Sequence, residues 1–128
     1  MSGPVAMHRD GDIAVIVVDN PPVNALRHEV RLGIRDAFAS ANADKDVAGI
    51  VLTCAGRTFI AGADITEFDK PPQSPSLIDL NGEIENIEKP VVAAVFGTPL
   101  GGGLEITLAC HFRIARAPIA KMAARVKR

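Results

Sequence analysis

The stretch KPVVAAVFGTPLGGGLEITLAC, residues 89–110, decides which fold this sequence can adopt. Residues 91–96 are nearly all β-branched or small and apolar, which is typical of a buried strand. A glycine-rich loop follows at residues 97–103, and residues 104–110 continue as an apolar segment. The stretch therefore predicts a strand, a glycine loop and a helix that begins among the glycines.

The segments on either side continue this alternation of strands and helices. The turn signal Asp10-Gly11-Asp12 separates two apolar segments, at residues 5–7 and 13–18, and predicts a hairpin. The other expected elements are a helix near residues 28–43, a buried strand at 47–53, a helix marked by Leu77, Leu80, Ile84 and Ile87, and a strand at 112–115. This order favours an α/β fold with a largely parallel sheet flanked by helices.

Composition and charge narrow the class of protein. The 128 residues suit one domain or a piece of a larger one, and 48% apolar residues are enough for a core. With a net charge of -1, the sequence lacks the excess of basic residues that is typical of proteins that bind nucleic acid. The sequence has no apolar signal core near its start and no apolar run long enough to span a bilayer. We therefore expect a cytoplasmic protein that binds neither nucleic acid nor membrane.

The two cysteines, Cys54 and Cys110, both stand among apolar residues. Two cysteines are too few for a disulfide framework, and no Cys or His spacing matches a metal site. Buried reduced thiols are expected, with no metal.

Two loops that contain glycine follow predicted buried strands. The first carries Ala61-Gly62-Ala63-Asp64, and the second carries three glycines at the expected start of a helix. Ligands of open α/β folds bind at this edge of the sheet, and unpaired N–H groups at a helix N-terminus attract an anion or a developing oxyanion. The phosphate-binding patterns do not fit, since Gly103 is followed by Leu104-Glu105 and the third position of a dinucleotide fingerprint is Ile106.

Glu105 is the one charged residue of this predicted helix, and two interpretations stay open. A glutamate in the first turn stabilises a helix through its dipole. A carboxylate beside an oxyanion site is also suited to acid/base catalysis.

Three segments together resemble the enoyl-CoA hydratase/isomerase, or crotonase, superfamily. They are NPPVNAL at residues 20–26, FIAGADITEF at 59–68 and KPVVAAVFGTPLGGGLEITLACHFRIA at 89–115. They occur in the family's order, and the likeness covers about residues 13–115. The first segment is similar to the hydratase part of multifunctional bacterial fatty-acid oxidation enzymes.

The resemblance implies a crotonase-like (ββα) spiral core and a set of site residues. The backbone N–H groups of Ala63 and Gly102 would form an oxyanion hole for a thioester carbonyl, and Glu105 would be the first of two catalytic glutamates. The acyl-CoA surface would include Ala25, Arg27, Ala61, Asp64, Ile65, Leu100 and Gly101. Coenzyme A would enter only as part of the substrate, with no other cofactor, and the family assembles as trimers or hexamers, so a homo-oligomer is expected.

The likeness stops near Ala115. Residues 1–116 therefore match the N-terminal part of a crotonase-like domain, which would be truncated, and residues 117–128 form a basic tail unlike the family. No Asp or Glu follows Glu105, so the family's second glutamate is absent from this sequence. A fragment of a longer product or an altered gene end explains this better than a naturally shortened protein.

The expected function is that of an enoyl-CoA hydratase of fatty-acid β-oxidation, which adds water to a 2-trans-enoyl-CoA. Two alternatives stay open. One is a Δ3-Δ2-enoyl-CoA isomerase, which can work with a single carboxylate. The other is a non-catalytic acyl-CoA-binding remnant of the family.

Overall fold

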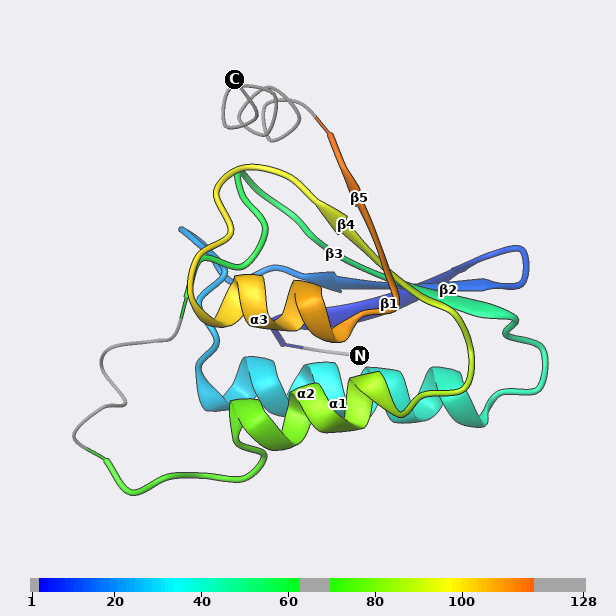
Figure 1. Ribbon diagram of the computed structural model, residues 1–128, viewed down its shortest axis with the longest axis horizontal. Helices are drawn as coiled ribbons and strands as arrows, with labels where there is room; N and C mark the ends of the chain where they lie inside the picture. Colours follow the sequence, from blue (N-terminus) through cyan, green and yellow to red (C-terminus); the bar gives the residue numbers. More distant parts are fainter. Residues whose placement is uncertain (1–2, 63–69, 117–128) are drawn as a thin grey trace.

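The computed structural model describes residues 3–62 and 70–116, and in this part of the chain five strands form one sheet in the order β1-β2-β3-β4-β5. The strands are β1 (Val5–Asp10), β2 (Ile13–Val18), β3 (Gly49–Cys54), β4 (Val91–Val95) and β5 (Phe112–Ala115). β1 and β2 form an antiparallel hairpin, whereas β2 to β5 run parallel to one another. The predicted α/β fold with a largely parallel sheet is confirmed (Figure 1).

Three helices of the described chain lie on the same side of this sheet (Figure 1). They are α1 (His28–Ala43), α2 (Leu77–Glu85) and α3 (Gly102–Ala109). The apolar stripe of α1 is buried as its spacing predicts, through Val30, Ile34, Ala37, Phe38 and Ala41. No helix in residues 3–62 and 70–116 has both the length and the apolar character needed to cross a membrane.

The observed element ends differ from the predicted ones by a few residues. The third strand begins at Gly49 rather than at Val47, because the Val47 amide donates to the Asp44 carbonyl oxygen in a turn (3.1 Å). The second helix ends at Glu85, and Ile87 packs against the core from beyond its end. Hydrophobic spacing indicates which residues are buried, not where a helix ends, so the prediction included Ile87 in the helix.

The two faces of the sheet differ in how well they are covered. Side chains of β2 alternate, and Ile16 points into the core under the helices. On the opposite face Val15, Val51 and Val92 lie side by side in register, and Phe112 of β5 continues this row with 59% of its surface exposed. The described helices do not cover this row, which we call the open sheet face, although parallel sheets are usually covered on both faces.

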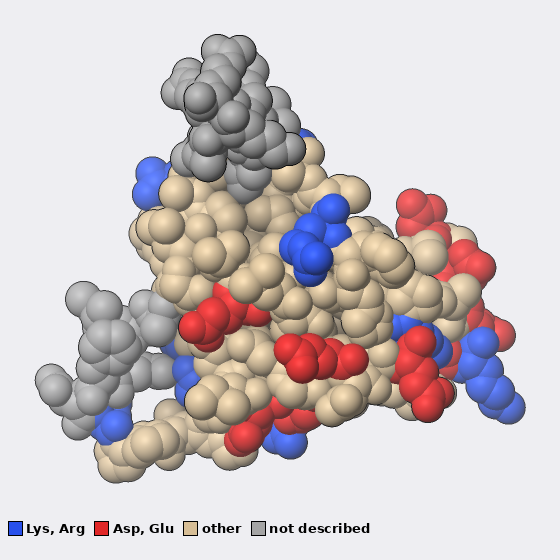
Figure 2. Space-filling view, in the orientation of Figure 1, with Lys and Arg blue, Asp and Glu red and all other residues tan. Residues whose placement is uncertain are grey.

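The surface charges are mixed. Figure 2 shows acidic and basic side chains interspersed over the face that carries the helices, with broad uncharged areas between them. Leu104 and Leu108 of α3 contribute to the uncharged surface, with 48% and 63% of their areas exposed. The described structure therefore places its exposed apolar side chains mainly on α3 and β5.

Both cysteines are free and buried, as the sequence predicts. Burial removes the thiols from water and raises the pKa of Cys54 and of Cys110 to about 12. A thiol with so high a pKa carries almost no thiolate near neutral pH, and the thiolate is the reactive form.

We expect iodoacetamide to leave both cysteines unmodified in the folded chain near neutral pH and to alkylate both after unfolding in urea, as measured by intact mass. Because the folded-state pKa of about 12 lies above the ordinary value of 9.0, the buried thiols contribute stability in full below pH 9.0. That contribution is lost as the pH rises towards 12. Fast alkylation of the native chain would contradict the burial of these thiols.

Candidate functional site

Three loops meet where the parallel strands end. They follow β2, β3 and β4, at residues 19–27, 55–62 and 96–101. Figure 1 shows the loops after β3 and β4 running side by side, and the Phe59 amide donates to the Phe96 carbonyl oxygen at 2.9 Å. The carboxyl ends of parallel strands are the usual place for a ligand in open α/β folds.

Asn24 connects two of these loops through its side chain. It is 2% exposed and adopts a left-handed backbone conformation with φ of 56°. Its Nδ2 donates to the carbonyl oxygens of Ala55 and Thr58 at 2.9 and 2.8 Å, and its Oδ1 accepts from the Asn20 amide at 2.7 Å. Both donors and the oxygen of the buried amide have partners, and the two donors fix the loop after β2 against the loop after β3.

Sequence reasoning assigned no role to Asn24, although it lies in the segment NPPVNAL. The residue type could have indicated this role, because asparagine tolerates the left-handed backbone region and its side chain can donate and accept hydrogen bonds at once. Thr58 connects the third loop, because its Oγ1 accepts from the amide of Thr98 at 2.8 Å.

Backbone hydrogen bonds complete the junction around Ala61 and Gly62. The Ala61 amide donates to the Val23 carbonyl oxygen, and the Leu26 amide donates to the Gly62 carbonyl oxygen, each at 3.0 Å. Ala61 also forms an isolated parallel bridge with Leu100. Ala61 and Gly62 are thus bound both to the loop after β2 and to the loop after β4.

The start of α3 packs directly on this junction. A Cβ at Gly103 would clash with the carbonyl group of Ile60, and a Cβ at Gly102 would lie 3.0 Å from methyl carbons of both Leu26 and Leu77. Only glycine lets the helix start approach so closely. The missing side chain of Gly103 therefore lets α3 pack against the Ile60 carbonyl group, and that of Gly102 leaves a narrow space beside Leu26 and Leu77.

The backbone amide of Gly102 is available at the first position of α3. Its neighbour Gly103 donates to the Leu100 carbonyl oxygen, and Glu105 donates through its amide to the Gly101 carbonyl oxygen, each at 3.0 Å. Among residues 3–62 and 70–116, no acceptor is found for the Gly102 amide. An unpaired N–H at the positive end of a helix favours a negatively charged oxygen.

Glu105 lies in the first turn of α3, three residues after Gly102, and is exposed. In the described structure its carboxylate makes no hydrogen bond or ion pair. Glu105 lies within one turn of the Gly102 amide along α3. Both interpretations of Glu105, dipole stabilisation and acid/base chemistry, remain compatible with this position.

The other predicted site residues fall into two groups. Ala25, Arg27, Ala61, Leu100 and Gly101 are described. Ala61 forms the bridge with Leu100, and Leu100 and Gly101 lead into Gly102 at the start of α3. Arg27 precedes α1 as its N-cap and pairs with Glu29 at 3.4 Å. Ala63, Asp64 and Ile65 lie outside the described residues, so the expected second oxyanion donor and its neighbours stay predictions.

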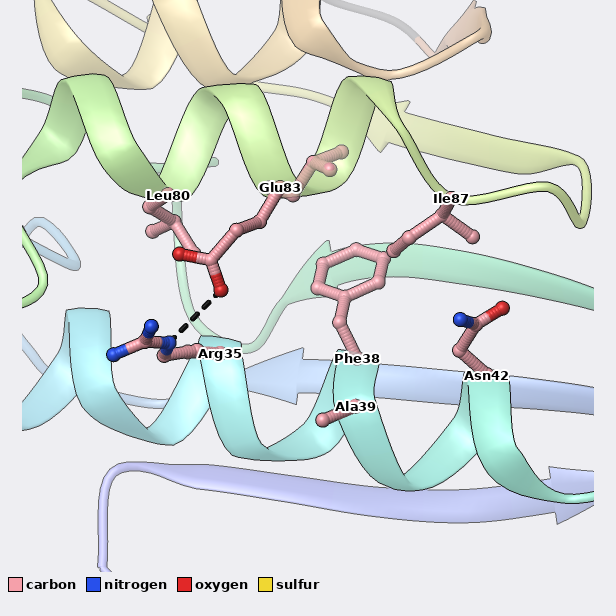
Figure 3. A pocket seen from close by; sticks show the side chains of 8 residues that line it. Arg35, Phe38, Ala39, Asn42, Leu80, Glu83 and Ile87 are labelled. Atoms are coloured by element: carbon pink, nitrogen blue, oxygen red, sulfur yellow. Dashed lines mark hydrogen bonds and ion pairs between the residues drawn. The ribbon is translucent and has the colours of Figure 1, made fainter.

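Two hollows of the described surface differ in their chemistry. One, of about 340 Å³, adjoins the bridge between Ala61 and Leu100, and its lining is Val23, Arg57, Thr58, Ala61, Gly97, Thr98 and Leu100. The other, of about 200 Å³, lies between α1 and α2 (Figure 3). Figure 3 shows Arg35 and Glu83 pointing towards one another there, in an ion pair of 2.8 Å that satisfies both charges. Only the first hollow lies at the junction of the three loops.

No group of three or more His, Cys, Asp or Glu side chains in the described part of the chain could hold a metal ion.

Comparison with known proteins gives a consistent match. The family model for enoyl-CoA hydratase/isomerase matches residues 8–125. A peroxisomal bifunctional enzyme of Danio rerio is 47% identical over 103 residues, which are 80% of this chain and 14% of that protein. A probable enoyl-CoA hydratase of Bacillus subtilis is 38% identical over 118 residues, which are 87% of this chain and 46% of that protein.

Solved structures agree with the sequence relatives. An enoyl-CoA hydratase/carnithine racemase from Magnetospirillum magneticum has a TM-score of 0.83 at 28% identity, covering 96% of this chain and 52% of that one. An enoyl-CoA hydratase subunit from Geobacillus kaustophilus has a TM-score of 0.81 at 32% identity, covering 90% of this chain and 47% of that one. The chain thus spans about half the length of these structures and a smaller share of the bifunctional enzymes.

We expect Asn24→Gly to lower the free energy of unfolding by about 1–3 kcal/mol, because buried carbonyl groups lose their donor. Glycine accepts the left-handed backbone, so the variant isolates the hydrogen bonds from backbone strain. Urea titration measures the loss. The control Asn42→Ala, on the exposed part of α1, should change stability by no more than about 0.5 kcal/mol. Equal effects of the two variants would rule out the connecting role of Asn24.

We expect Gly103→Ala to destabilise the fold by about 1–3 kcal/mol or more, since the added methyl group meets the Ile60 carbonyl. Gly82→Ala in α2 is the matched control, because nothing lies within 4 Å of its Cβ position. That substitution should stabilise the helix by about 0.5–1 kcal/mol. Thermal unfolding of both variants checks the pair, and a neutral Gly103→Ala would show that α3 does not need this close approach.

Proposed function

This chain belongs to the enoyl-CoA hydratase/isomerase family, and on that premise we propose that it acts on the thioester of a 2-trans-enoyl-CoA as a hydratase of fatty-acid β-oxidation. The observation that carries this proposal is the available amide of Gly102 at the start of α3, held against the loop that leads to Ala63. Backbone donors placed in this way stabilise a developing oxyanion.

The proposed reaction adds water across the conjugated double bond. The water oxygen bonds to C3, and the electron pair of the double bond moves towards the thioester oxygen, which gains enolate character. The amides of Gly102 and Ala63 hold that oxygen, and each such donor contributes about 3–4 kcal/mol to transition-state stabilisation. Glu105 accepts a proton from the attacking water and returns it to C2, so that the hydroxyl and one hydrogen of the same water add across the double bond and the carboxylate is regenerated.

The binding surface for acyl-CoA is proposed from the family resemblance. It comprises Ala25, Arg27, Ala61, Asp64, Ile65, Leu100 and Gly101, with Asp64 shaping its loop rather than carrying a proton. Small residues at Ala61 and Gly101 let the ligand approach the backbone closely. Coenzyme A enters as part of the substrate, and the proposed chemistry requires no metal.

One observation bears on two further candidates. Glu105 is the one carboxylate of α3, and residues 106–128 carry no Asp or Glu. A Δ3-Δ2-enoyl-CoA isomerase can move a proton with a single carboxylate, and a non-catalytic acyl-CoA-binding protein needs none. The position of Glu105 in the first turn of α3 favours the hydratase.

We expect the chain to convert crotonyl-CoA, followed by loss of the enoyl-thioester absorbance, and Glu105→Gln to lower the rate at least about 100-fold. Glu88→Gln, which changes an exposed glutamate outside the site, should leave the rate unchanged. An unaltered rate in Glu105→Gln would remove Glu105 from the mechanism. Binding without turnover in the unmodified chain would favour the non-catalytic candidate, and failure to bind any acyl-CoA would refute the proposal.

We also propose that the chain self-associates through apolar surface on β5 and the open sheet face. Phe112 and Ile114 are 59% and 62% exposed on the edge strand, and contiguous apolar surface promotes association. Analytical ultracentrifugation should therefore detect species larger than a monomer, and Ile114→Lys should shift the distribution towards the monomer. A compact, stable monomer of the unmodified chain would contradict this proposal.

A further inference from the structure

Two side chains from the first turn of α1 bind three consecutive backbone carbonyls of the segment that precedes α2. His28 Nε2 lies 2.8 Å from the Ser74 carbonyl oxygen. Arg31 donates through Nε to the Pro75 carbonyl oxygen at 2.8 Å and through Nη2 to the Gln73 carbonyl oxygen at 3.3 Å. The segment 73–75 is thus attached to α1 by side chains rather than by backbone pairing.

The same guanidinium reaches a second segment on its other side. Arg31 Nη1 donates to the Leu26 carbonyl oxygen at 2.7 Å, and the Leu26 amide in turn donates to the Gly62 carbonyl oxygen at 3.0 Å. Arg31 therefore connects the loop after β2 with the segment before α2. Hydrogen bonds from a charged donor are stronger than neutral ones, and the planar fork holds them in fixed directions.

These two segments carry side chains that pack against Gly102. Leu26 lies in the first segment, and Leu77 follows Pro75 by two residues at the start of α2. Their methyl carbons each lie 3.0 Å from the Cβ position of Gly102. Arg31 binds the carbonyl oxygen of Leu26 itself and that of Pro75, two residues before Leu77, so it acts close to both of these contacts.

We propose that Arg31 is a positioning residue for the oxyanion site: by holding in place the segments that carry Leu26 and Leu77, which both pack at the Cβ position of Gly102, it fixes the direction of the Gly102 amide. This inference rests on the proposed function, in which that amide stabilises the thioester oxygen. Arg31 touches no substrate in this role. Lysine does not replace it, because one ammonium group cannot reproduce the fork that reaches both segments.

Arg35 provides a matched control one turn further along α1. It also ties α1 to α2, through the ion pair of Arg35 Nε with Glu83 Oε1 at 2.8 Å. Both side chains of this pair are more than 40% exposed, and the pair lies away from Gly102 in the hollow between α1 and α2 (Figure 3). Loss of Arg35 removes a contact between the two helices and leaves the carbonyls of Leu26 and Pro75 bound.

The functional test uses acetoacetyl-CoA, an enolisable thioester whose enolate absorbs in the near ultraviolet, with free CoA as a second ligand. We expect Arg31→Gln and Arg31→Lys to lower the bound enolate fraction roughly tenfold, the effect of losing one charged hydrogen bond. Affinity for free CoA should stay within about twofold, since free CoA lacks the thioester oxygen. Arg35→Gln should leave the enolate fraction unchanged. Arg31 variants with an unchanged enolate fraction would overturn the inference.

Amide hydrogen exchange tests the same contacts without relying on the proposed function. Exchange at the Leu26 amide, which donates to Gly62, should be roughly tenfold faster in Arg31→Gln and unchanged in Arg35→Gln. Unchanged exchange at Leu26 in Arg31→Gln would overturn the positioning role. If the unmodified chain stabilises no enolate, the proposed function fails together with this role, and the exchange data then show only whether Arg31 holds the two segments.

Discussion

The buried amide of Asn24 is the interaction on which the arrangement of the three loops depends. Its two donors join the loop after β2 to the loop after β3, and its acceptor binds the Asn20 amide within the loop after β2. Once that junction is set, the segment ending in Gly62 has a fixed place, and α3 can begin against the Ile60 carbonyl. A single side chain can do this because a buried polar group must find partners, so few alternative loop positions are stable.

The site that results consists mainly of backbone. The fold presents the amide of Gly102 at a helix start, shaped by glycines, and adds one exposed carboxylate from Glu105. Backbone donors need no change of ionisation to act, and they cost little reorganisation when charge develops on a bound oxygen. The precision of such a site depends on the packing around it, which is why Leu26, Leu77 and the side chains that hold them matter for its chemistry.

Much of the fold could be predicted from the sequence, because α1, the hairpin and the strand–glycine loop–helix unit are each encoded within a short stretch. Apolar spacing identified the buried face of α1, and the glycines marked the start of α3 within a few residues. The contacts of Asn24 with Ala55 and of Arg31 with Pro75 could not be predicted, since they join residues more than 30 positions apart. The roles of Ala63, Asp64 and Ile65 rest on the resemblance alone.

The open sheet face has a further consequence for how this chain behaves in solution. Val15, Val51, Val92 and Phe112 form a row across four strands on that face. Contacts made by such side chains are driven by the release of water, so they weaken on cooling and strengthen when sulfate is excluded from the surface. Self-association through this row would therefore depend on temperature and salt more than on pH, since the row carries no ionisable group.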